Sequence, residues 1–429
     1  LFTAHRCTAC HSDVSKPRQP ISLDQAAFRF NPTWLARWLD DPTALRNHTR
    51  MPRLFGDSPT EKEALHNIVA YLTQRPARAT ISTAGMVDRG EVLWEELGCI
   101  GCHTFSADRK PDEWNRTSLH YASQKYLPPA LGQFLRQPHR HNRWSRMPDF
   151  GLSEAQARDL RDWIRSRSTG RLKAAGQAMP GNADRGKQQF LSRGCIACHE
   201  ISGLKPPVAR PVPLPFGRKQ QRGCLAVVIG PGRTAPRIPD YQFSPGQRSD
   251  LAAYLARTGN QAEIRSPLEL VHSTIRELRC LACHDRDARP SPRRLIIAEE
   301  SERGVLPEIL PDLTWAGEKL HADWTRQLLA GRLKHPSRPW LKARMPAFGA
   351  WADHLAAGLA AEHGVSFKSR PGPDPDRALA ALGAKLTLKQ NGFNCLQCHG
   401  VGKTPAIAPF DNRGVNFARV RERLRYDFY

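Results

Sequence analysis

Five copies of one short motif constrain this chain more than any other feature of its sequence. Each copy has two cysteines separated by two residues and followed at once by a histidine. This is the attachment motif of a c-type haem, in which both thiols bond to one porphyrin and the histidine ligates its iron. Zinc knuckles or redox dithiols are the alternative interpretation. Since the five copies use ten of the eleven cysteines, we interpret the chain as a pentahaem c-type cytochrome.

The motifs define the expected cofactor-binding residues. The five covalent haems are expected on cysteine pairs, which are Cys7 and Cys10, Cys99 and Cys102, Cys195 and Cys198, Cys280 and Cys283, and Cys395 and Cys398. The expected iron ligands on one side are the motif histidines His11, His103, His199, His284 and His399.

The spacing of the motifs predicts a tandem array. Successive first cysteines lie 92, 96, 85 and 115 residues apart, which is about the length of one small domain. So short a module has a small core, and a haem would supply the missing apolar mass. We expect an all-α chain of five modules, the fifth incomplete, over residues 1–80, 84–172, 183–262, 266–365 and 376–429.

The second module shows the expected order of elements most completely. A lead-in helix over 88–98 ends in glycine directly before Cys99, a short helix covers 129–135, and a closing helix follows Ser153. Between the last two stands Arg146-Met147-Pro148. This order resembles class I cytochromes c. The resemblance implies that a methionine loop supplies the sulfur ligand opposite the histidine.

Three methionines occupy that place. Met51, Met147 and Met345 each stand between arginine and proline, 40, 44 and 61 residues after their own motif histidines. Methionine in a core is usually a gap filler. Because three of only five methionines share this context, we expect all three to ligate iron, as the resemblance implies. The other histidines are then not needed as ligands of the first, second and fourth haems.

The third module lacks this methionine. Ile238, between arginine and proline, stands in the same place and cannot bind iron. Cys224 is a candidate ligand for the third haem. The alternative is that Cys224 is only a small buried side chain and binds no iron. Further alternatives are Lys205, Lys219, Met179, a ligand from elsewhere in the chain, or an open or water-bound position.

Stretches of the fourth and fifth modules resemble multidomain cytochromes of Planctomycetes and related bacteria. The residues that carry this resemblance are 313–320, 338–346 and 416–425. It implies a lineage and no particular activity. The fifth module has no methionine loop or closing helix, so we expect the polypeptide to continue beyond Tyr429, and to begin with a further helix before Leu1.

Charge and composition limit the partners. The formal net charge of +23 suits an acidic redox partner or an anionic docking surface, although arginines that pair with haem propionates would offset part of it. No motif for nucleic-acid binding and no membrane-spanning segment is apparent. Haem c is attached outside the cytoplasm, so we expect a periplasmic or otherwise extracytoplasmic protein.

Two functions remain. The first is an electron carrier that passes electrons between redox partners, within a larger assembly, through a series of covalently bound haems. The alternative is a haem enzyme or enzyme subunit, peroxidase-like or acting on another small molecule, with an open haem in the third module. No catalytic residue is predicted, and a non-catalytic carrier is favoured.

Overall fold

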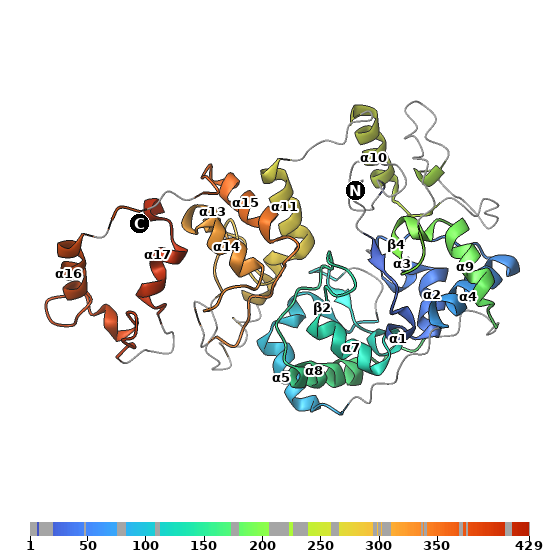
Figure 1. Cartoon of the computed structure of the whole chain (residues 1–429), viewed down its shortest axis with the longest axis horizontal. Coiled ribbons are helices and arrows are strands. Elements are labelled where there is room, and N and C mark those ends of the chain that lie inside the picture. Colours follow the sequence, from blue (N-terminus) through green and yellow to red (C-terminus); the bar gives the residue numbers. More distant parts are fainter. Residues whose placement is uncertain are drawn as a thin grey trace. The chain divides into compact units, whose positions relative to one another are not determined.

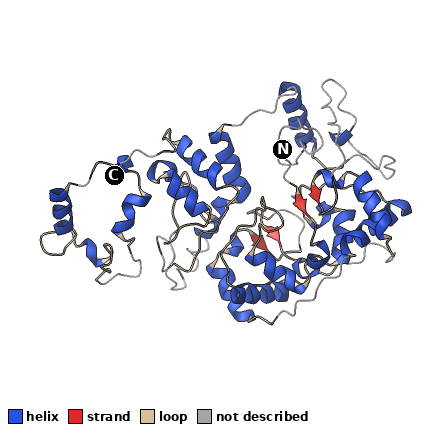
Figure 2. Cartoon of the chain, viewed as in Figure 1, coloured by secondary structure: helices blue, strands red, loops and turns tan. Residues whose placement is uncertain are grey.

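The computed structural model describes most of the chain, and its described part is mostly helical (Figures 1 and 2). The described residues are 7, 20–46, 49–74, 83–107, 112–172, 180–205, 223–225, 239–258, 266–294, 298, 302, 310–335, 338, 341–368, 372–374, 376–407 and 414–428. No helix among them combines the length and apolar character needed to cross a membrane.

The chain divides into two compact units. The first comprises Leu1–Val92, His103–Arg143 and Leu152–Ile264, and the second comprises Leu93–Cys102, Trp144–Gly151 and Arg265–Tyr429.

Short helices and two-residue strands make up the first unit. Its elements are β1 (Ile21–Ser22), α1 (Ala26–Arg29), α2 (Pro32–Asp40), α3 (Pro42–Leu45), α4 (Pro59–Thr73), the start of α5 (Val87–Glu96), β2 (His103–Thr104), β3 (Thr117–Ser118), α6 (Ala122–Lys125), α7 (Pro128–Arg136), α8 (Glu154–Arg167), α9 (Ala183–Ser192), the 3-10 turn η3 (Cys195–Ala197), β4 (His199–Glu200), the 3-10 turn η4 (Gly223–Leu225) and α10 (Pro245–Thr258).

The named elements among the described residues of the second unit are α-helices and 3-10 turns joined by loops. Its elements are the end of α5, the 3-10 turn η2 (Cys99–Gly101), α11 (Pro267–Leu278), the 3-10 turn η5 (Cys280–Ala282), α13 (Ala316–Lys319), α14 (Ala322–Leu329), α15 (Ala352–Glu362), α16 (Arg377–Leu386), the 3-10 turns η6 (Cys395–Gln397) and η7 (Phe417–Arg419), α17 (Val420–Arg423) and the 3-10 turn η8 (Tyr426–Phe428).

Local capping explains where the longer helices begin. The Ser153 side chain accepts a hydrogen bond from the Gln156 N–H, and the Gln156 side chain accepts one from the Ser153 N–H. Ser266 and Glu269 form the same capping box at α11, and Ser58 caps α4. Each reciprocal pair satisfies N–H groups that a helix start leaves without partners.

Lead-in and closing helices of the second and fourth modules cross closely at a glycine. A Cβ on Gly90 in α5 would lie 2.3 Å from the Asp159 carbonyl oxygen in α8. In the fourth module the glycine lies on the other helix, because Gly358 of α15 faces Val271 of α11 at 2.4 Å. In both pairs the helices can approach this closely only because the residue at the crossing is glycine, which has no Cβ.

The packing of helix α4 differs from that of the closing helices α8 and α15, which pack on the lead-in helices of their own modules. Its most extensive packing is against α9, which was expected to lead into the third motif, and it also packs against α2 and α1 of its own module. A Cβ on Gly186 of α9 would lie 1.9 Å from the Asn67 carbonyl oxygen of α4. The Asn67 side chain accepts a hydrogen bond of 2.6 Å from the Asn182 N–H at the start of α9. One core joins the two segments, with Phe190 and Ile196 among the buried side chains of α1, α2 and α4.

One short backbone contact recurs in both units. In the first unit, Phe30 at the end of α1 forms an antiparallel bridge with Tyr126 at the end of α6. In the second unit, Leu320 at the end of α13 forms the same bridge with Leu424 at the end of α17. Arg425 reinforces this bridge by donating to the Leu320 carbonyl oxygen. The bridges join neighbouring groups of helices through equivalent positions.

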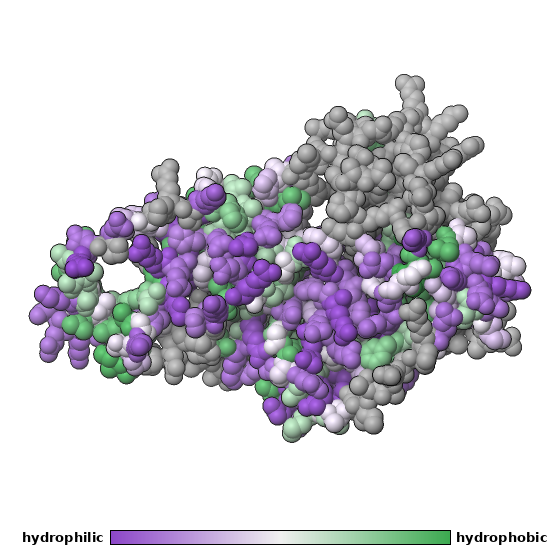
Figure 3. Space-filling view, in the orientation of Figure 1, coloured by the Kyte–Doolittle hydropathy of each residue, from purple (hydrophilic) through white to green (hydrophobic). Residues whose placement is uncertain are grey.

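Surface hydropathy differs along the chain. In Figure 3 hydrophilic side chains cover much of the visible described surface, and apolar side chains gather around α16. The exposed apolar side chains there include Leu379, Leu382 and Phe393, the last 79 % exposed. In the fourth module, by contrast, the apolar face of α11 is buried under α15.

Candidate haem-attachment sites

The second to fifth motifs share one backbone conformation. The residue before the first cysteine is left-handed in each, with φ between 57° and 72° at Gly98, Gly194, Arg279 and Asn394. This conformation ends the preceding chain direction as a helix C-cap does. A single 3-10 turn then begins at the first cysteine.

The 3-10 turn explains the two-residue spacing between the cysteines. The N–H of the second cysteine donates to the carbonyl oxygen of the first at 3.1–3.2 Å in all four motifs. Side chains three residues apart eclipse one another in a 3-10 turn. The two thiols of a motif are therefore presented on one side of the backbone, as attachment to one porphyrin requires.

Hydrogen bonds set the tautomer of three motif histidines. Nδ1 of His103, His284 and His399 lies 3.2, 2.7 and 2.8 Å from the carbonyl oxygens of Thr117, Pro311 and Val415. A carbonyl oxygen can only accept, so Nδ1 carries the proton and Nε2 is the nitrogen with a lone pair. This is the usual arrangement of a metal-ligating histidine, and it fits a haem iron.

The donor set fits a haem better than a protein-only metal site. Within the described ranges, no group of three or more histidine, cysteine, aspartate or glutamate side chains converges to hold an ion. A haem needs no such group, because the porphyrin supplies four ligands to its iron. When attached, this group would supply one-electron redox chemistry at iron.

Burial raises the pKa of several motif thiols in the second, third and fourth motifs. It raises the pKa of Cys99, Cys195 and Cys280 to about 12 and that of Cys283 to about 11. The Cys102 and Cys283 thiols add to the shift at Cys99.

The second and fourth motifs pack against each other in the second unit. A Cβ on buried Gly101 would lie 3.2 Å from the carbonyl oxygen of Ala282 and 3.4 Å from its Cβ. Arg279 Nη1 donates to the Cys102 carbonyl oxygen at 3.0 Å. The two attachment sites are thus direct neighbours although 181 residues separate their first cysteines.

The two expected methionine loops of the second unit also meet. Asp149 and Ala347, each two residues after its methionine, exchange backbone hydrogen bonds of 3.0 and 2.7 Å. Met147 is partly buried, whereas Met345 is 39 % exposed. The loops that carry Met147 and Met345 are therefore joined to each other two residues after each methionine.

Met51 is held more tightly than the other two. Trp38 Nε1 donates to its sulfur at 2.9 Å, and its side chain packs on the core that contains Ile196. The sequence pattern predicted Met51 but gave no reason to single out Trp38. Its apolar spacing in α2 is typical of a core residue.

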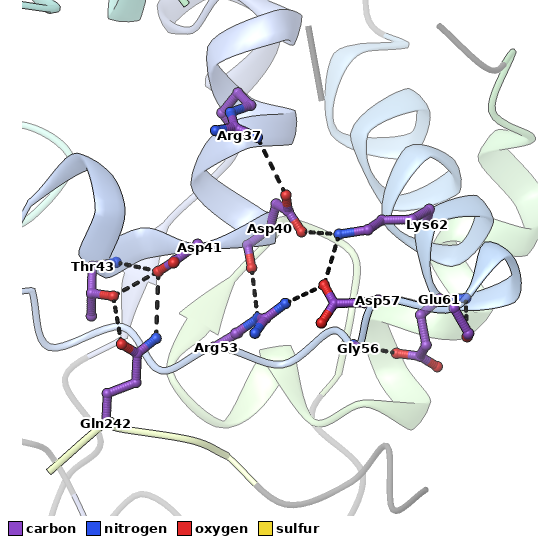
Figure 4. Close-up of polar contacts among 11 residues, drawn as sticks. Arg37, Asp40, Asp41, Thr43, Arg53, Gly56, Asp57, Glu61, Lys62 and Gln242 are labelled. Atoms are coloured by element: carbon purple, nitrogen blue, oxygen red, sulfur yellow. Dashed lines mark hydrogen bonds and ion pairs between the residues drawn. The ribbon is translucent and has the colours of Figure 1, made fainter. Parts of the chain in front are cut away.

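A polar network fixes the loop that follows Met51 (Figure 4). Arg53 donates to the Asp40 carbonyl oxygen at 3.1 Å and to the Asp57 carboxylate at 2.6 Å. Lys62 at the start of α4 forms ion pairs with Asp40 and Asp57. The loop is thereby tied to the end of α2 and the start of α4. Gln242 contacts the same region through Thr43 at 2.9 Å.

The remaining predicted residues are placed as follows. Cys7 is described and partly buried, while Cys10, His11, Met179 and Ile238 lie outside the described residues. His199 begins strand β4 and pairs in parallel with Ile21 of β1. Cys224 is partly buried in the turn η4, and its role as a ligand stays a prediction.

Comparison with family models, with curated proteins and with solved structures found no match to this chain.

Proposed function

We propose that this chain is a pentahaem c-type cytochrome that transfers electrons between redox partners through covalently bound haems. Five Cys-x-x-Cys-His motifs support this function, together with the turn geometry of the four described ones. The proposal includes an all-α array of modules that resemble class I cytochromes c. It also includes the lineage, a resemblance to multidomain bacterial cytochromes. Attachment of haem c implies a periplasmic or other extracytoplasmic location.

The observation that carries electron transfer is the contact between the second and fourth motifs. Gly101 lies directly against Ala282, and the Cys283 thiol is close enough to raise the pKa of Cys99. A carrier needs neighbouring redox centres, whereas an isolated catalytic haem has no need of such a pair. The bridge between Leu320 and Leu424 joins the fourth module to the fifth in the same unit, which supports a series of more than two centres.

The chain's own residues have separate tasks in this function. The paired thiols would hold each haem covalently, and His103, His284 and His399, with the Nδ1 proton donated to a carbonyl oxygen, would present Nε2 to its iron. Buried apolar side chains beside the third and fourth motifs would exclude water, which lowers the reorganisation that accompanies a change of charge. The basic surface would attract an acidic redox partner.

Production in a host that carries out haem c maturation tests the attachment. The intact mass should exceed that of the polypeptide by five haems. A chain that carries zinc or no cofactor would refute the function. Peroxide turnover separates the two functional classes, because a haem enzyme should bind carbon monoxide at its open haem and turn over peroxide, whereas a carrier should show no peroxide turnover.

The variant Gly101→Val tests the carrying contact. Its side chain would push the second and fourth motifs apart, so the redox interaction between these two haems should weaken in a potentiometric titration. The matched control is Gln397→Val, because the fifth motif already holds a large side chain at this position. An unchanged interaction in Gly101→Val would refute direct exchange between the two sites.

A further inference from the structure

We infer that Met51 is the sulfur ligand of the haem on Cys195 and Cys198, opposite His199, and does not serve the first haem. This inference rests on the proposed haem function. It assigns the third site a composite structure, in which residues 183–204 provide the attachment and residues 20–73 provide the rest of the module.

Equivalent helix contacts carry the first step. In the second module, the Asp159 side chain accepts from the Met86 N–H at 2.8 Å, thirteen residues before Cys99. In the third, the Asn67 side chain accepts from the Asn182 N–H at 2.6 Å, thirteen residues before Cys195. Helix α4 therefore stands to α9 as α8 stands to α5.

The crossing glycines agree with this equivalence. Gly90 and Gly186 both lie nine residues before the first cysteine of their motifs. Gly90 faces the Asp159 carbonyl oxygen and Gly186 faces that of Asn67. Since the same two positions contact each other in both pairs, α4 is the closing helix of the third site.

Strand pairing after the histidine carries the second step. In the second module, β2 begins at His103 and pairs in parallel with β3, and the Leu119 N–H donates to the Thr104 carbonyl oxygen at 2.7 Å. In the third module, β4 begins at His199 and pairs in parallel with β1. The Leu23 N–H donates to the Glu200 carbonyl oxygen at 2.9 Å. Strand β1 thus occupies the place of β3.

Further polar contacts hold β1 at this site. The Asp24 carboxylate accepts from the backbone N–H of Ser202 at 2.6 Å and from its hydroxyl at 2.8 Å. Both residues lie just beyond the paired strands. Residues 20–24 are therefore anchored directly after the third motif.

The loop after Met51 reaches the third motif directly. Arg193, two residues before Cys195, forms a two-point ion pair with Glu61 at 2.7 and 2.9 Å. It also donates to the Leu54 carbonyl oxygen at 3.1 Å, and its guanidinium lies 4.6 Å from the Phe55 ring centre. Both partners in the ion pair are largely buried. Arg193 thus connects the third attachment site to the methionine loop and to α4.

Side-chain packing completes the argument. Met51 and Cys195 both pack against one core, whose buried members include Phe190, Ile196 and Phe55. Read as residues 183–204 followed by 20–73, the elements have the order of the second module: helix, motif, strand, short helices, methionine loop and closing helix. One methionine serves one iron, so it is the first haem that lacks Met51.

Two parent chains, each without one haem, test the assignment. The variant Cys7→Ser/Cys10→Ser removes the first haem, and Cys195→Ser/Cys198→Ser removes the third, as intact mass will verify. Met51→Ala is then made in both, and the weak near-infrared band of His/Met-ligated haem is recorded. With the first haem absent, Met51→Ala should remove about one third of the band, because three methionines contribute to it. With the third haem absent, it should remove nothing.

The reverse pattern would overturn the assignment and return Met51 to the first haem. Loss of the band in neither parent would also overturn it. A polypeptide that carries no haem would refute the proposed function itself, and the intact masses distinguish that failure from the other two.

A charge exchange provides a second test if a parent chain does not fold. Glu61→Arg alone should weaken the Met51 contribution to the near-infrared band. It should also lower the temperature at which half of that band is lost on heating. The double variant Glu61→Arg/Arg193→Glu should restore both. The control pair is Glu63 and Arg185, which also joins α4 to α9 but is exposed on both sides, so reversal of Glu63 should change neither readout. Equal effects of the two reversals, or no effect of Glu61→Arg, would contradict the composite site.

Discussion

Replacement of Gly186 by alanine should separate α4 from α9. The new Cβ would lie 1.9 Å from the Asn67 carbonyl oxygen and 2.9 Å from the Tyr71 Cβ. Both are backbone or near-backbone atoms that cannot rotate away. Ordinary contact needs about 3.4 Å, so the helices must move apart by more than about 1 Å.

The magnitude follows from three effects. Overpacking of this kind costs about 1–3 kcal/mol. Alanine regains about 1 kcal/mol of helix propensity over glycine in α9. Separation also weakens the hydrogen bond from Asn182 to Asn67, which contributes about 0.5–1.5 kcal/mol. We therefore expect a net loss of about 0.5–3.5 kcal/mol of local stability.

Amide hydrogen exchange measures this loss where it arises. Peptides from α4 and α9 should lose protection together, since exchange reports the free energy of local opening. The control is Gly383→Ala in α16, where no atom lies within 4 Å of the new Cβ, so alanine should be neutral or stabilising there. Unchanged protection of α4 in Gly186→Ala would refute the packing of these two helices.

Three further outcomes are expected. Leu65→Ala, at a fully buried position in α4, should cost about 2–5 kcal/mol in denaturant unfolding, and a cost below about 1 kcal/mol would contradict its burial. Gly414→Ala should displace the His399 ring, because its Cβ would lie 2.3 Å from Nδ1, and the fifth haem should then show a changed ligand-field spectrum, whereas an unchanged spectrum would refute this contact. Burial, with Arg29 and Arg140 nearby, lowers the pKa of His141 from 6.5 to about 4. The unfolded chain then binds more protons, so stability should fall as the pH decreases from about 6.5 to about 4, and His141→Gln should flatten that dependence in urea titrations.

The motifs and most helix starts follow from the sequence because their causes are local. Ser153 and Gln156 form a capping box within four residues, and a glycine before Cys99 ends its helix. The spacing of the cysteines similarly gives the turn that presents both thiols. Such features depend on neighbours in the chain and not on the tertiary fold.

The pairing of α4 with α9 could not be predicted in the same way. An apolar stripe on α4 would fit any lead-in helix, since burial of apolar surface has no direction and little specificity. The choice depends on long-range contacts, such as Glu61 with Arg193 and Asn67 with Asn182. The contact of Gly101 with Ala282 could not be predicted from the sequence either, because Gly101 there is only one of the two residues between Cys99 and Cys102.

The pairing of α4 with α9 also determines when the first part of the chain can finish folding. The hydrogen bond from Asn182 to Asn67 joins residues 115 positions apart, so this core forms only by closing a long loop, and such topologies fold slowly. Until α9 docks, α1 and α2 cover only part of the apolar surface of α4, and the side that receives α9 stays exposed. We therefore expect residues 20–74 to bind a chaperone until residues 183–192 reach them.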